Sequence, residues 1–111
     1  MPRARQLVAA AQAGDFGTAY RCTSTRFRER VPLTRFQAVL ERDLDIRGAT
    51  VRRLTFAGQT SNRAGKAEGE LQTRGGVIPV TLALNRAVMD MDYLVDDIEA
   101  GGRSLFPELE R

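Results

Sequence analysis

The chain has 111 residues, 42% hydrophobic and 28% charged, which predicts one folded domain with its own core. One cysteine and no histidine exclude an intramolecular disulfide, a zinc site built from several thiolates, and catalysis by a serine–histidine or cysteine–histidine pair. The formal charge of +3 is uneven, because residues 1–63 carry 12 basic and 5 acidic side chains whereas residues 64–111 carry 5 and 9. The two halves can therefore neutralise one another, within one molecule or across a dimer.

Helical periodicity marks the start of the chain. A helix over residues 2–14 is predicted, with Pro2 at an early helical position and Gly14 as its stop. The apolar residues recur at the i, i+3, i+4, i+7 spacing of one helix face. They are Ala4, Leu7, Val8 and Ala11.

A second, short helix is predicted to begin after Asp15, which can cap it. Phe16, Ala19 and Tyr20 would share one face of this helix.

A third helix is predicted over residues 34–44 and ends before Gly48. Thr34 and Gln37 form a candidate capping box at its start. Its buried stripe would consist of Phe36, Val39, Leu40 and Leu44.

The second half of the chain predicts strands over residues 49–58, 64–74, 77–85 and 87–99. Tight turns are predicted at Gly75–Gly76 and Asn85–Arg86. Pro79 cannot donate a ladder hydrogen bond, so its strand should start at an edge or contain a bulge. The fold class is therefore α+β, with three N-terminal helices packed on a four-stranded antiparallel sheet.

The order of these motifs resembles the nuclear transport factor 2-like superfamily, also described as cystatin-like cone folds. The resemblance runs through residues 4–42 and 69–102 and is carried by few side chains. These are the Gly14–Asp15 corner, Ala19–Tyr20, and Leu33 with Phe36. One departure is the lack of the Gly-Trp pair that many members carry in the last strand, where this chain reads Arg86-Ala87-Val88-Met89.

The resemblance implies a strongly curved sheet wrapped around the helices, with a cavity at the open end of the cone. Members of the superfamily include bacterial enzymes, small-molecule binders and interaction domains, so the fold does not choose a function. Residues 1–100 would form this single domain and residues 101–111 a C-terminal tail. Leu105 and Phe106 in that tail are expected to dock on the edge of the chain's own sheet.

The last predicted strand carries alternating acids. One face would hold Met89, Met91, Tyr93 and Val95, and the other would hold the aspartates Asp90, Asp92 and Asp96. Burying unpaired carboxylates costs several kcal/mol each, so the apolar set should face the core. Two carboxylates from one strand also supply too few oxygens for calcium, and no metal site or cofactor is predicted.

Arginines cluster between the second and third helices. Arg26, Arg28, Arg30 and Arg35 are expected to form a solvated face that pairs with Glu29, Glu41 or the acidic last strand. The alternative is an interaction surface together with Asp90 and Asp92. Nucleic acid is not expected as a partner, because the acidic second half would repel it and no nucleic-acid motif is present.

The tyrosines are the best polar candidates inside the cone. Tyr20 is expected to be a core residue with its hydroxyl bonded to backbone. If a ligand pocket exists, its lining is predicted to be Tyr20, Phe36, Leu40, Phe56, Met91 and Tyr93.

The favoured function is a non-catalytic small-ligand-binding or protein-interaction module. A homodimer is expected through the outer sheet face, where the acidic last strand could meet Arg52 or Arg53. The first alternative is an isomerase- or dehydratase-type enzyme that uses a tyrosine with Asp90 or Asp92 inside the cone on an apolar ligand. The second is the soluble head of an envelope protein anchored by a segment upstream. The chain itself has no apolar run long enough to enter a membrane, so it should be soluble, in the cytoplasm or as such a head.

Overall fold

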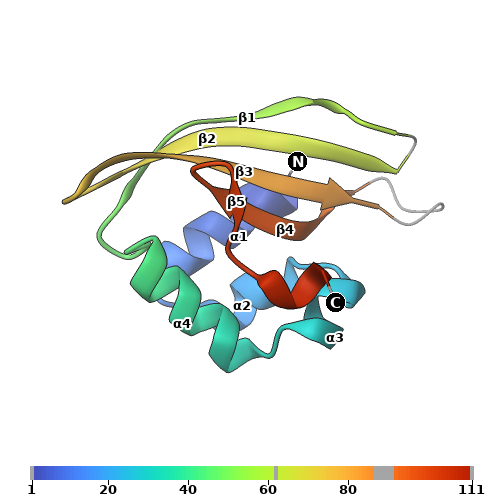
Figure 1. Ribbon diagram of the computed structural model, residues 1–111, viewed down its shortest axis with the longest axis horizontal. Coiled ribbons are helices and arrows are strands. Elements are labelled where there is room, and N and C mark those ends of the chain that lie inside the picture. The colour runs from blue at the N-terminus through green and yellow to red at the C-terminus, as the bar shows by residue number, and fades with distance from the viewer. Residues whose placement is uncertain (1, 62, 87–91, 111) are drawn as a thin grey trace.

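Helices form one layer and an antiparallel sheet forms the other (Figure 1). The computed structural model describes residues 2–61, 63–86 and 92–110. The described helices are α1 (Pro2–Gln12), α2 (Phe16–Arg21), α3 (Thr25–Arg30) and α4 (Leu33–Asp43). They are followed by β1 (Thr50–Gln59), β2 (Ala64–Thr73), β3 (Gly76–Asn85), β4 (Leu94–Ala100), β5 (Arg103–Ser104) and the 3₁₀ helix η1 (Pro107–Glu110).

The strands pair in chain order, β1-β2-β3-β4-β5, and each pair is antiparallel. All the helices lie against one face of the sheet and leave the opposite face bare (Figure 1). The α+β prediction is confirmed, with five strands in place of the four expected. The prediction of a strongly curved sheet is wrong. The sheet is open and not strongly curled, with β1 and β5 at opposite edges.

The helix α3 was not predicted. Ser24 caps it, because the Ser24 hydroxyl accepts a hydrogen bond from the Phe27 backbone N–H at 3.1 Å. Phe27 is the one apolar side chain in this six-residue helix, so the sequence shows no repeating apolar stripe there.

The start of α4 also differs from the prediction. The helix begins at Leu33, Pro32 is its N-cap, and no side chain caps it. Thr34 therefore lies inside the first turn, and Gln37 donates to Glu41 at 3.0 Å. The predicted Thr34–Gln37 capping box is wrong.

The connection before β4 is longer than expected. Asn85 pairs with Leu94, so residues 86–93 connect the two strands. The prediction of a tight turn at Asn85–Arg86 is therefore wrong. Residues 87–91 of the predicted last strand lie outside the described residues. Within β4, Ala83 pairs with Asp97 while Leu84 pairs with Val95, which makes Asp96 the extra residue of a β-bulge.

The core lies between the helices and the inner face of the sheet. The helical stripe residues Leu7, Phe36 and Leu40 are buried as predicted. From the sheet, the core receives apolar side chains at alternate positions, which is the pattern of a one-sided antiparallel sheet. They include Ala67, Leu71, Val80, Leu82, Leu84, Val95 and Ile98.

The C-terminal segment completes this core. β5 pairs with β4, and the following residues bring Phe106 (0% exposed) and Leu109 (4% exposed) into the interior. The Phe106 ring packs edge-on against Phe27, with ring centroids 4.9 Å apart. Phe106 docks on the chain itself as expected, but the predicted place is wrong: it enters the interior beside Phe27 of the helical layer and does not lie on the edge of the sheet.

A β-bulge bends β1 at the open edge of the sheet. Arg52 pairs with Glu70 and Thr55 with Glu68, so Arg53 and Leu54 together face Gly69. Arg53 takes a left-handed backbone conformation with φ of 56°, which costs an L-residue about 1–2 kcal/mol. A Cβ on Gly69 would lie 3.0 Å from the Leu54 Cα and 3.3 Å from the Arg52 carbonyl oxygen.

This bulge predicts opposite effects for two substitutions. Arg53→Gly should raise the free energy of unfolding by roughly 0.5–1 kcal/mol, because the relief of the left-handed strain outweighs the added entropy of the unfolded chain. Gly69→Ala should lower it by roughly 1–3 kcal/mol, because backbone must shift to admit the methyl group. Urea unfolding of both variants measures these changes. A destabilised Arg53→Gly variant would contradict the assigned conformation.

The docked C-terminal segment gives a second prediction. Phe106→Ala should lower the free energy of unfolding by about 3–5 kcal/mol, because it leaves a cavity beneath Phe27. Phe56→Ala is the matched control. Phe56 is 43% exposed, so its replacement should lower the free energy of unfolding clearly less than Phe106→Ala does. Equal losses in urea unfolding would show that residues 105–110 do not belong to the core.

Candidate functional site

The residues predicted to line a pocket are distributed over three places. Tyr20 and Phe36 are neighbours, with ring centroids 5.5 Å apart. Leu40 lies deeper, between the helices and the sheet. Phe56 and Tyr93 form a separate ring pair at 5.7 Å, and Met91 lies outside the described residues. The described members do not surround one common cavity.

Tyr20 is held by the helical layer. Its hydroxyl donates a hydrogen bond to the Val31 carbonyl oxygen and lies 3.1 Å from the Arg28 carbonyl oxygen. Burial raises the pKa of the Tyr20 hydroxyl, and the nearby Arg28 opposes this shift only in part. The expected role of Tyr20, a packed residue whose hydroxyl binds backbone, is confirmed.

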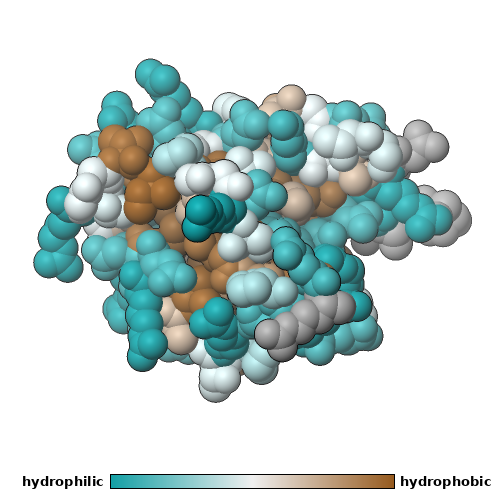
Figure 2. Space-filling model, in the orientation of Figure 1, coloured by the Kyte–Doolittle hydropathy of each residue, from teal (hydrophilic) through white to brown (hydrophobic). Residues whose placement is uncertain are grey.

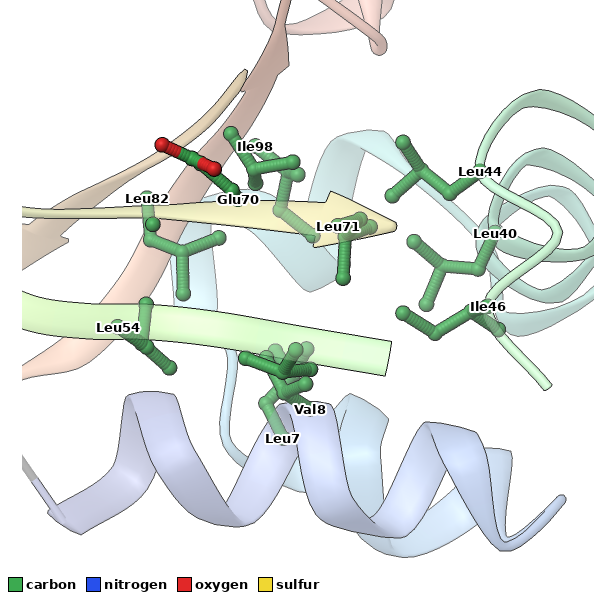
Figure 3. Close-up of a pocket in the computed structure, with 13 residues that line it drawn as sticks. Leu7, Val8, Leu40, Leu44, Ile46, Leu54, Glu70, Leu71, Leu82 and Ile98 are labelled. Atoms are coloured by element: carbon green, nitrogen blue, oxygen red, sulfur yellow. The ribbon is translucent and has the colours of Figure 1, made fainter. Parts of the chain in front are cut away.

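Leu40 lines a narrow apolar slot between the two layers (Figure 3). Leu44 and Ile46, which follow the end of α4, project toward Leu71 on β2, and Leu7 and Val8 project from α1. The slot has a volume of only ≈20 Å³, whereas sites for drug-sized ligands have roughly 300–1,000 Å³. Glu70 borders the slot, but its carboxylate points away from these apolar side chains (Figure 3).

Hydrophobic surface gathers where the slot approaches solvent. Figure 2 shows it between the sheet and α4, left of centre in that view and bordered by hydrophilic residues.

Phe56 and Tyr93 lie near the other end of the sheet. The Phe56 ring lies over Gly65, where an added Cβ would approach a ring carbon to 2.9 Å. The Arg86 guanidinium lies 5.7 Å from the centre of the Tyr93 ring, a cation–π contact. The pair therefore stabilises the sheet, with Gly65 as the residue that admits the ring.

The predicted arginine surface is partly used by the fold itself. Arg26 pairs with Asp96 of β4 at 3.2 Å, and Arg35 pairs with Glu108 of η1 at 3.0 Å. Arg28 and Arg30 form no ion pair with any residue that the structure describes. The expectation that the arginines pair with the acidic last strand is confirmed for Arg26.

The acids of the last strand take different positions from those predicted. Asp92 lies in a bend before β4 and pairs with Arg3 of α1 at 3.2 Å, and Asp90 lies outside the described residues. Asp96 accepts a hydrogen bond from the Ser24 hydroxyl at 2.7 Å. These contacts join β4 to the helical layer.

Asp97 follows the β4 bulge and anchors the C-terminal segment. One of its carboxylate oxygens accepts hydrogen bonds from the Ser104 hydroxyl at 2.8 Å and from the Ile98 N–H at 2.7 Å. Burial nevertheless raises the pKa of Asp97, because the loss of water outweighs these hydrogen bonds.

Cys22 is buried at the C-terminus of α2, with its sulfur 3.5 Å from the Thr18 carbonyl oxygen. Burial is also the main cause that raises the pKa of the Cys22 thiol, and Arg3 opposes it. A thiol in this state is a weak nucleophile.

Two grooves lie on the bare outer face of the sheet. One, of ≈450 Å³, is lined by residues of β1, β2 and β3, and the other, of ≈400 Å³, by residues of β2, β3 and β4. Glu68 and Thr81 border both.

The acids of β4 that border this face are Asp96 and Glu99, which line the second groove, and Asp97, whose pairing with Ala83 gives it an outer position. The outward position of Asp97 was not predicted. The sequence signal for it was the spacing of three residues between the buried Val95 and Ile98, which the β-bulge produces.

The comparisons add no assignment. No protein-family model matches the chain, and no curated protein is significantly similar to it. The fold is an α+β arrangement of N-terminal helices and a five-stranded antiparallel sheet. Within the described residues, no three His, Cys, Asp or Glu side chains are grouped to hold a metal ion. No described helix is long and apolar enough to cross a membrane.

Asp97 gives a prediction about pH. A carboxyl whose pKa is raised on folding binds more protons in the folded state, so its contribution to stability falls as pH rises through the unfolded and then the folded pKa. Asp97→Asn keeps an oxygen acceptor for Ser104 and Ile98 but cannot ionise. The stability of the variant relative to the original chain should therefore increase between about pH 3.5 and pH 7, as measured by urea unfolding at each pH. A difference that is constant or decreases across this range would contradict the burial of Asp97.

Proposed function

We propose that this chain is a non-catalytic protein-interaction module that binds through the bare outer face of its sheet, and that its partner is a second copy. The observation that carries the proposal is the contrast between the two faces. The interior slot between the sheet and the helices has a volume of only ≈20 Å³, whereas the outer face is open along β1 to β4 (Figure 1).

Charges of both signs lie on the outer face. Arg52 lies on β1, while Asp97 and Glu99 lie on the outer side of β4. Between them, β2 carries Lys66, Glu68 and Glu70 at outer positions, with Glu70 opposite Arg52 and Lys66 in an ion pair with Glu68, and the outer positions of β3 are uncharged. The β1 edge of this face is therefore cationic and its β4 side is acidic.

The strand register shows how two copies could meet. Thr55, Glu68, Thr81 and Glu99 form one row across the sheet through successive pairs. A two-fold axis parallel to the strands, between β2 and β3, would place β1 of one copy opposite β4 of the other. Thr55 would then face Glu99 of the second copy, and Glu68 would face Thr81. Arg52 would lie in the adjacent outer row, that of Glu70 and Pro79, next to Glu99 of the second copy.

Two of the groups named for the enzymatic alternative, Tyr20 and Asp92, are used in other contacts. Tyr20 donates its hydroxyl proton to backbone, and Asp92 is paired with Arg3. The carboxylate of Glu70 points out of the slot (Figure 3). These contacts favour binding over acid–base chemistry in the interior.

The relation to the nuclear transport factor 2-like superfamily belongs to this proposal as well. It is supported by the order of helices before an antiparallel sheet. The Gly14–Asp15 corner, Tyr20 and Phe36 all lie in the helical layer that the two folds would share. The open sheet is the main departure.

Charge reversal tests the proposed pairing. Sedimentation equilibrium should show self-association of the original chain that weakens as salt increases. Arg52→Glu or Glu99→Arg alone should weaken it by at least about tenfold, since each places like charges in adjacent rows across the interface. The double variant should restore association, because a two-fold axis brings the exchanged residues together again.

Arg42→Glu is the control, since it makes the same change of charge on an exposed position of α4. The proposal fails if the original chain stays monomeric across the accessible concentrations. It also fails if Arg42→Glu weakens association as much as Arg52→Glu does.

A further inference from the structure

A groove runs along the seam between α1 and β1, on the helical side of the sheet edge. It has a volume of ≈260 Å³. From α1 it is lined by Arg5, Val8, Ala9 and Gln12, and from β1 by Val51, Arg53 and Leu54. No carboxylate is among these lining residues.

The floor of this seam groove is apolar and continues into the core. Val8, Val51 and Leu54 line both the seam groove and the interior slot. Val8 and Val51 are partly buried against the core cluster, and Leu54 is 8% exposed. An apolar group lying in the groove would therefore cover hydrophobic surface that is now in contact with water.

The rim of the seam groove is cationic. Arg5 and Arg53 are both exposed, and neither forms an ion pair with the part of the chain that the structure describes. Glu68 and Glu70 share the outer-face groove with Arg53, yet neither lies within ion-pair distance of it. Gln12 is fixed by donating to the Ala49 carbonyl oxygen at 2.8 Å.

Arg53 reaches this rim because of the bulge in β1. Its left-handed backbone, with φ of 56°, is one that glycine would adopt without strain. Gly69 opposite leaves the space that the bulge requires. The chain thus holds a strained arginine beside an apolar groove, and backbone strain of this kind concentrates at binding sites.

We infer that the seam groove binds a small amphipathic carboxylate. Its carboxylate would lie between Arg5 and Arg53, whose planar guanidinium groups suit that shape, and its alkyl chain would lie on Val8, Val51 and Leu54. This site shares Arg53 with the outer-face groove, whereas Arg5 and the apolar floor lie on the helical side of the sheet.

Octanoate is the probe. Octanol keeps its alkyl chain but lacks the carboxylate, and acetate keeps the carboxylate but lacks the long alkyl chain. Titrations followed by ¹H–¹⁵N and methyl NMR should show saturable octanoate binding with shifts at Val8, Val51 and Leu54. Octanol and acetate should each bind at least about tenfold more weakly than octanoate, because octanol loses the charge-assisted hydrogen bond and acetate loses the apolar contact.

Two variants locate the head group. Arg5→Gln and Arg53→Gly should each weaken octanoate binding by about tenfold, although Arg53→Gly should fold at least as stably as the original chain. Arg103→Gln is the control, because it removes one exposed arginine at the opposite edge of the sheet; it should leave binding unchanged.

The inference is overturned if octanoate causes no saturable shifts, or if octanol binds as tightly. It is also overturned if Arg103→Gln weakens binding as much as Arg5→Gln, which would indicate attraction to net charge alone. Failure of sheet-face pairing with intact octanoate binding would refute the proposed function and leave this site in place.

Discussion

The packing of Phe27 connects three parts of the chain that are distant in sequence. Its ring contacts Phe36 of α4 at 5.7 Å and Phe106 of the C-terminal segment at 4.9 Å between centroids. All three side chains are fully buried. Because α3, α4 and the residues after β5 meet at these rings, the helical layer and the C-terminal segment together close the interior beneath the sheet. The binding surfaces that we propose therefore lie outside the core.

The charged residues divide according to this architecture. Arg3–Asp92, Arg26–Asp96 and Arg35–Glu108 each join segments far apart in sequence and hold the layers together. Their exposure means that each contributes little to stability by itself. The arginines of β1 are not used in this way. Arg53 borders both the outer-face groove and the seam groove and forms no ion pair with a described residue, and Arg52 donates a hydrogen bond to Gln72 of the neighbouring strand.

The elements that the sequence predicted well are those with long periodic patterns. Leu7 and Ala11 in α1, Phe36 and Leu40 in α4, and the alternating residues of β2 and β3 all face the core as their spacing indicates. Helix α3 escaped prediction because one phenylalanine cannot form a stripe, and its Ser24 cap becomes evident only when the helix is known. The local hydrophobic pattern was sufficient to predict the buried face of a helix or strand wherever that face is buried along its whole length.

The candidate sites were harder to predict because they depend on register. The β4 bulge at Asp96 brings Asp97 to an outer position, and the β1 bulge at Arg53 directs an arginine to the sheet edge. A one-residue shift changes the face of every later side chain in a strand. Tyr20 and Phe36 are neighbours because both belong to the helical layer. Phe56 and Tyr93 lie apart from them because strand pairing, which is non-local, sets their position.

The central claim is that the outer face of the sheet is the binding surface. A dilution series followed by ¹H–¹⁵N NMR tests it most directly, because amide shifts that change with protein concentration locate the contact without any substitution. The account predicts such changes at Thr55, Glu68, Thr81 and Glu99, with the amides of α4 unaffected. Changes confined to α3 and α4, or spectra that do not vary with concentration, would contradict it.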